Sequence, residues 1–107
     1  MEINRYSSID VVVNVEHGLG LSASSQIVQE CSKYGRTIYI FNKEFLYGGY
    51  ADGRRVIDIM GLGAAKGHEL QIFVEGDDEE AEEILLKLYN GIRSEHKWDM
   101  KFEKERN

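Results

Sequence analysis

Short stretches in which hydrophobic and polar residues alternate recur along this chain. The runs 9–16 and 69–75 place aliphatic, largely β-branched residues at every second position, between mostly polar neighbours. A period of two in such residues predicts a strand with one buried face. The apolar segments 37–41 and 45–47 flank the polar turn 42–44, so together they predict a hairpin. The pattern therefore predicts four strands.

Apolar residues at helical spacing mark three further segments. The clearest one follows the turn 76–78, and its apolar stripe consists of Ala81, Ile84, Leu85, Leu88 and Ile92. Glutamates fill its first turns, where the helix dipole favours negative charge. The segment 22–34 starts at serines that can cap a helix and ends at a glycine. A shorter helix, weakened by Gly61 and by Gly63 just after it, is predicted at 56–62, beyond the glycine-rich loop 48–53.

These elements follow the order β-α-β-β-α-β-α, with too few strands for a doubly wound parallel sheet. A four-stranded, mostly antiparallel sheet with its helices on one face would bury every apolar stripe. The opposite face would be partly wet, which fits Glu69, Gln71 and Glu75 on the last of the four strands. The predicted fold class is therefore α+β, and 107 residues suit one domain.

Composition narrows the classes of function. A net charge of −6 argues against general nucleic-acid binding, which needs a basic surface. It also argues against an anionic membrane, and no apolar run approaches the length of a membrane span. The single cysteine, Cys31, lies on the apolar stripe of its helix, so we expect a core residue in a cytoplasmic protein. His68 and His96 lack metal-ligand spacing, and we expect neither a metal nor a cofactor.

Three stretches carry a resemblance to a known family. Residues 18–23, Gly-Leu-Gly-Leu-Ser-Ala, fall where HPr proteins, the histidine-containing phosphocarriers of the bacterial sugar phosphotransferase system, show Gly-Ile-His-Ala-Arg-Pro. Residues 28–34 match the rest of the family's first helix. Residues 54–67 are similar to its Lys-Ser-Ile-Met segment and its Leu-Gly-x-x-Lys-Gly exit. The resemblance runs from about residue 9 to residue 92. It implies an HPr-like open-faced β-sandwich and a protein that is not itself an enzyme.

The same resemblance implies that the family's functional residues are missing here. The phosphate-accepting histidine falls on Gly20, its partner arginine on Ser22 and the helix-starting proline on Ala23. The regulatory serine falls on Arg55. Because glycine has no nucleophile, phosphohistidine cannot form at Gly20. We therefore expect no catalytic residue, and a binding or regulatory module that has lost phosphotransfer.

Partners of the family dock on the exposed ends of the first two helices, so we expect a protein partner there, with phosphotransferase-system components as candidates. The matching positions are Leu19, Leu21, Arg54, Arg55, Val56, Ile57 and Met60. If the second helix is instead buried all round, this patch does not exist.

A second hypothesis keeps phosphate transfer but moves it to His17. This histidine lies three residues before Gly20 and could reach the same helix N-terminus, whose free amides favour an anion. The simpler interpretation is an exposed loop histidine. The serines at the start of the helix are better explained as caps than as nucleophiles, since no base lies beside them in sequence.

The end of the chain lies beyond the HPr-like segment, which we place at 1–94. In the extension 95–107, Trp98, Met100 and Phe102 alternate with charged residues, which is a strand pattern. Such a strand could pair with a sheet edge in the same chain or in a second copy. A structural or oligomerising role through this extension is the third hypothesis, and a frayed, charged tail is the alternative.

Overall fold

The structure is a computed structural model that describes residues 5–96 and 103–106. Its elements are strand β1 (Tyr6–Val12), helix α1 (Leu21–Cys31), strands β2 (Ile38–Asn42) and β3 (Tyr50–Asp52), helix α2 (Val56–Met60), strand β4 (Glu69–Glu75), helix α3 (Glu79–His96) and strand β5 (Glu103–Arg106). The predicted order β-α-β-β-α-β-α is confirmed, and one strand is added after it.

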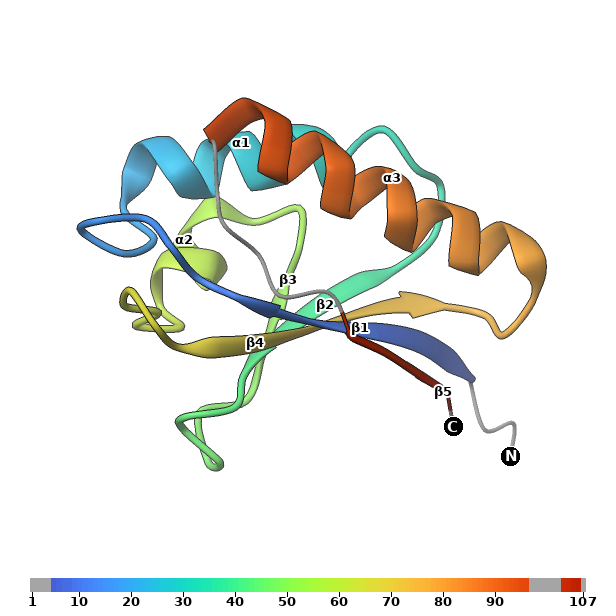
Figure 1. The fold of residues 1–107 in the computed structure, drawn as a ribbon, viewed down its shortest axis with the longest axis horizontal. Coiled ribbons are helices and arrows are strands. Elements are labelled where there is room, and N and C mark those ends of the chain that lie inside the picture. The colour runs from blue at the N-terminus through green and yellow to red at the C-terminus, as the bar shows by residue number, and fades with distance from the viewer. Residues whose placement is uncertain (1–4, 97–102, 107) are drawn as a thin grey trace.

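The strands form one antiparallel sheet in the order β3-β2-β4-β1-β5, and the helices cover one of its faces (Figure 1). Ile72 of β4 lies between Ile9 of β1 and Ile40 of β2. This register turns the aliphatic residues of the three central strands toward the helices, where they form the core. The predicted α+β fold with one open sheet face is confirmed.

The open face of the sheet is less exposed to solvent than the strand pattern predicted. Aromatic side chains from four strands cluster on it: Tyr6, Tyr39, Phe41, Tyr50 and Phe73. Neighbouring ring centroids lie 5.1–6.4 Å apart, in tilted or edge-to-face arrangements that stabilise aromatic pairs. The glutamates and the glutamine of β4 are half-buried beside this cluster.

The third strand lies at Tyr50–Asp52 rather than at the predicted segment 45–47. At the end of β2, the side-chain oxygen of Asn42 accepts a hydrogen bond from the N–H of Glu44 (3.0 Å), which closes a tight turn. Gly49, with φ of +76°, then redirects the chain into β3. The prediction was wrong because apolar character alone favoured a strand at 45–47, whereas the turn chemistry of Asn42 leaves that segment in solvent.

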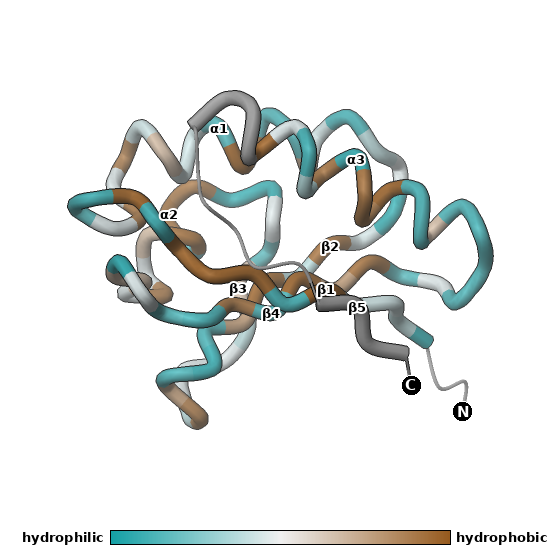
Figure 2. The backbone as a smooth tube through the Cα atoms, viewed as in Figure 1, coloured by the Kyte–Doolittle hydropathy of each residue, from teal (hydrophilic) through white to brown (hydrophobic). Residues whose placement is uncertain are grey.

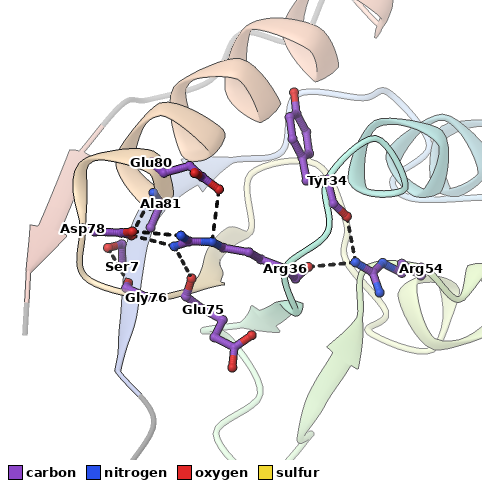
Figure 3. A network of polar contacts seen from close by, with 9 residues as sticks. All are labelled: Ser7, Tyr34, Arg36, Arg54, Glu75, Gly76, Asp78, Glu80 and Ala81. Atoms are coloured by element: carbon purple, nitrogen blue, oxygen red, sulfur yellow. Dashed lines mark hydrogen bonds and ion pairs between the residues drawn. The ribbon is translucent and has the colours of Figure 1, made fainter.

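One arginine joins the start of α3 to the sheet (Figure 3). The two Nη atoms of Arg36 donate to the two carboxylate oxygens of Asp78 (2.6 and 2.8 Å), and Nε lies 3.4 Å from the Glu80 carboxylate. Asp78 Oδ1 also accepts the N–H of Ala81 (3.2 Å), so Asp78 caps the helix. The Arg36 hydrogen bond, supported by that of Ala81, holds the pKa of Asp78 well below its usual range.

Strand β5 occupies the outer edge of the sheet. It pairs antiparallel with β1, and the pairs run from Ser7 opposite Arg106 to Asp10 opposite Glu103. The extension therefore forms a strand within its own chain. Trp98, Met100 and Phe102, on which the predicted strand rested, lie outside the described residues, and the boundary at 94 stays a prediction. None of the helices within the described ranges is both long and apolar enough to cross a membrane.

Candidate functional site

The loop between β1 and α1 is fixed to the segment that follows α2. The N–H of Gly18 donates to the carbonyl of Val15 and that of Leu19 to the carbonyl of Ala64, both at 2.9 Å. Gly18 has a φ of +72°, and a Cβ there would collide with the Ala64 carbonyl oxygen. Glycine alone tolerates both the dihedral angle and the close approach. The position at which α1 begins is therefore set by backbone contacts.

Helix α1 starts at an N-cap residue without a side chain. Gly20 has ordinary extended dihedral angles (φ −82°, ψ −165°), and its carbonyl accepts the N–H of Ser24 (2.9 Å). The first N–H groups of a helix have no acceptor within it, and Gly20 has no side chain that could cap them. A Cβ at Gly20 would meet no heavy atom within 4 Å. The helix start is therefore an uncapped set of donors with open space beside it.

His17 lies in the exposed turn before this helix start. Its neighbour Glu16 pairs with Lys66, with 3.0 Å between Oε2 and Nζ, and this hydrogen bond holds the pKa of Glu16 below its ordinary value. Among the residues that the structure describes, no hydrogen bond joins the His17 ring to α1. The structure thus places His17 in the same loop as Gly20 without attaching its ring to the helix.

Helix α2 has one buried and one exposed face. Ile59 is fully buried, whereas the exposed fractions of Ile57 and Met60 are 76% and 38%. Leu21, at the start of the neighbouring helix α1, is also exposed. Ile57 and Met60 point outward, so α2 is not buried all round, and their role in binding stays a prediction.

The two arginines before α2 are placed differently. Nη2 of Arg54 donates to the carbonyls of Tyr34 (2.8 Å) and Arg36 (2.9 Å), so this end of the guanidinium ties α2 to the segment after α1 (Figure 3). Arg55 is the N-cap residue of α2, and its side chain is 69% exposed. Its Nε lies 3.7 Å from the carboxylate of Asp58, a loose surface pair. Both arginines are exposed, and their role in binding stays a prediction.

One residue predicted for the docking surface does not belong to it. The side chain of Leu19 is 6% exposed and packs in the core, because the hydrogen bond to Ala64 draws the loop inward. Val56 is half-buried. The exposed members define what we call the α1–α2 face: Leu21, Arg54, Arg55, Ile57 and Met60.

An exposed apolar turn between β2 and β3 was missed by the sequence interpretation. Phe45, Leu46 and Tyr47 are 49%, 75% and 101% exposed. Three consecutive large apolar residues, followed by a glycine pair, lack the alternation that marks a half-buried strand. That lack of alternation, together with the turn-forming Asn42 before it, is the signal that indicates a surface loop.

An α+β sandwich with three helices on one sheet face is also the architecture of solved phosphocarrier structures. The histidine-containing phosphocarrier protein of a mycoplasma superimposes with a TM-score of 0.72 at 16% identity, covering 86% of this chain and 98% of that one. HPr from Bacillus anthracis gives a TM-score of 0.66 at 26% identity, covering 80% and 95% of the two chains. The fold is therefore that of a small phosphocarrier domain.

Sequence comparison identifies the family. A family model described as the PTS HPr component phosphorylation site matches residues 7–90. The chain is 32% identical over 85 residues to the multiphosphoryl transfer proteins of Salmonella typhimurium and Escherichia coli O157:H7. That alignment covers 79% of this chain and 22% of those relatives, so the chain spans about a fifth of their length. The chain belongs to the HPr family of the phosphotransferase system.

Proposed function

We propose that this HPr-family domain is a protein-binding or regulatory module, located in the cytoplasm, that does not accept phosphate at the start of α1. The observation that carries the proposal is Gly20, the N-cap residue of α1, at the position that the resemblance assigns to the phosphate-accepting histidine. Glycine has no atom that can form a bond to phosphorus. Ser22, at the position of the partner arginine, is exposed and supplies no positive charge to a phosphoryl group.

The residue at the family's regulatory position is also one that cannot be phosphorylated there. Arg55 stands where the family has its serine, so phosphoserine cannot form there. A guanidinium also brings positive charge to the N-terminus of α2, whereas phosphorylation would bring negative charge. A protein that recognises this helix start therefore presents a carboxylate to Arg55 rather than an arginine cluster to a phosphate.

The α1–α2 face supports binding of a protein partner. Leu21, Ile57 and Met60 expose apolar side chains on two neighbouring helices, next to the charge of Arg55. An apolar patch with a charged rim is a usual docking surface. HPr-family domains interact with other phosphotransferase-system proteins, and these are the partners that we propose for this face.

A phosphorylation assay tests the proposed loss of transfer. The purified protein is incubated with radiolabelled phosphoenolpyruvate and the enzyme that phosphorylates HPr proteins. We expect no label on the wild type. The matched control is the double variant Gly20→His/Ser22→Arg, which should gain acid-labile phosphate, because position 20 has open space and ordinary dihedral angles. Label on any residue of the wild type would contradict the proposal.

The competing carrier hypothesis predicts a different result in the same assay. His17 is exposed and belongs to the same loop as Gly20. If it is the acceptor, the wild type carries acid-labile phosphate that His17→Ala abolishes. Absence of label on the wild type, with label on the Gly20→His/Ser22→Arg control, would exclude His17.

A further inference from the structure

The turn between β2 and β3 holds its apolar side chains in solvent by a defined set of contacts. The N–H of Gly48 donates to the carbonyl of Phe45 (2.9 Å), and the Phe45 ring packs edge-on against His68, with centroids 5.6 Å apart. Leu46 and Tyr47 lie at the tip and are 75% and 101% exposed. Figure 2 shows this hydrophobic tip projecting from the sheet, on the side away from the helices. These contacts hold the base of the turn, which lowers the entropic cost of ordering it on binding.

A pocket of about 210 Å³ lies beside this turn, between it and the segment that follows α2. Its lining includes Phe45, Leu62 and four glycines: Gly48, Gly49, Gly61 and Gly63. Because the glycines carry no side chains, an incoming apolar group can approach the backbone closely. A cavity of about 150 Å³ accommodates a benzene molecule, so this pocket has the size for a leucine side chain or a tyrosine ring.

We propose that the apolar tip of one copy of this chain occupies the pocket of a second copy, and the reverse, in a twofold symmetric dimer. Each copy carries an apolar projection and an apolar recess side by side, which is what an isologous interface requires. This proposal is independent of the proposed loss of phosphotransfer.

The distribution of charge favours this arrangement over others between two copies of an acidic chain. Six acidic residues gather at the start of α3: Asp77, Asp78, Glu79, Glu80, Glu82 and Glu83. This acidic end lies across the molecule, which is 39 Å long, from the β2–β3 turn (Figure 1). A dimer joined at the turns keeps the two acidic ends apart by more than the screening length of about 8 Å at physiological salt.

The apolar area that the turn can bury shows which class of interface the dimer belongs to. A fully exposed aromatic residue presents roughly 150–250 Å², so Phe45, Leu46, Tyr47 and Tyr50 together present roughly 600 Å² per copy. Two copies would bury about 1,200 Å², which is the lower limit for a specific interface. The expected dimer is therefore weak, reversible and populated at high protein concentration.

Sedimentation velocity over a concentration series, from low micromolar to millimolar, tests the proposal. The wild type should shift from monomer to dimer, and Leu46→Glu and Tyr47→Glu should each weaken association at least tenfold. Leu86→Glu is the matched control, since Leu86 is an exposed leucine on α3, and it should leave association unchanged. In a mixed sample of differently labelled copies, nuclear Overhauser contacts should join Leu46 or Tyr47 of one copy to Leu62 of the other.

Three results would overturn the proposal. The first is a wild type that stays monomeric at millimolar concentration. The second is a dimer that survives both tip substitutions, or that Leu86→Glu disrupts. The third is a dimer whose intermolecular contacts lie away from Leu62.

Discussion

The glycine before the start of α1 offers a sharp test of how the site is built. Gly18→Ala would force a residue with a Cβ to keep a φ of +72° and to meet the Ala64 carbonyl oxygen. The left-handed conformation alone costs about 1–2 kcal/mol. Relieving the collision moves the loop and weakens the hydrogen bond from Leu19 to Ala64, which contributes about 0.5–1.5 kcal/mol. We therefore expect the free energy of unfolding to fall by about 2–3 kcal/mol.

Gly20→Ala is the matched control for this substitution, because it lies in the same loop and also adds one methyl group. Gly20 has negative φ, and its Cβ would have no heavy atom within 4 Å, so only the weaker capping preference of alanine applies. We expect a loss of less than about 1 kcal/mol. Urea unfolding followed by circular dichroism measures both. Equal losses in the two variants, or a loss below about 1 kcal/mol for Gly18→Ala, would refute a loop fixed by this contact.

Three further predictions concern groups away from the helix start. Burial raises the pKa of the Cys31 thiol to about 12. A thiol reagent should therefore label the native protein at neutral pH only as fast as the protein unfolds, and rapid labelling would contradict a buried, protonated thiol. The pKa of Asp78 is lowered by Arg36, so its stabilising effect is present above its ordinary pKa of 3.8 and is lost as pH falls below that value. The urea midpoint of the wild type should therefore fall more steeply with acid than that of Arg36→Gln, and parallel curves would count against the pair. Gly91→Ala would place a Cβ against the buried carboxylate of Glu30, so thermal unfolding should show that the free energy of unfolding falls by about 1–3 kcal/mol. Helix propensity alone predicts a gain in stability, and such a gain would show that the Glu30 side chain moves aside freely.

Periodicity predicted the long elements well because each has one face against the core. In β4, the even-numbered residues are buried and the odd-numbered ones are half-exposed, which is the alternation seen in the sequence. In α3, the stripe Ala81, Ile84, Leu85, Leu88 and Ile92 is buried as a whole. These elements are long enough for a pattern of period two or 3.6 to be distinguished from chance.

Short segments were predicted less well because their surroundings decide their structure. The strand β3 spans three residues, and only Ala51 among them is buried, so it carries no readable period. Its formation depends on pairing with β2, and the preceding turn depends on the Asn42 side chain. The apolar segment 45–47 resembles a strand more than β3 itself does. A pattern of hydrophobic residues indicates which residues are apolar, but it does not indicate the direction of the chain after a turn.

Contacts between distant residues were not predictable from the sequence at all. Arg54 stands before α2 and is exposed, and its guanidinium donates to carbonyls 18 and 20 residues away. Leu19 is predicted for the docking surface and is instead buried through its bond to Ala64. Neither partner has a sequence signal, because a backbone carbonyl is present at every position.

The residues that define the fold around the helix start are not the residues that carry the family's chemistry. Gly18, Leu19 and Ala64 hold the loop through backbone contacts and burial. Gly20 and Arg55, at the positions that the resemblance assigns to the phosphohistidine and the phosphoserine, are exposed, and each begins a helix through backbone hydrogen bonds that do not depend on its side chain. Structural similarity to HPr proteins therefore depends on residues such as Gly18, Leu19 and Ala64. It does not indicate whether the residues at positions 20 and 55 can carry phosphate. We therefore expect two substitutions at these exposed positions, Gly20→His and Ser22→Arg, to restore an acceptor on an unchanged scaffold.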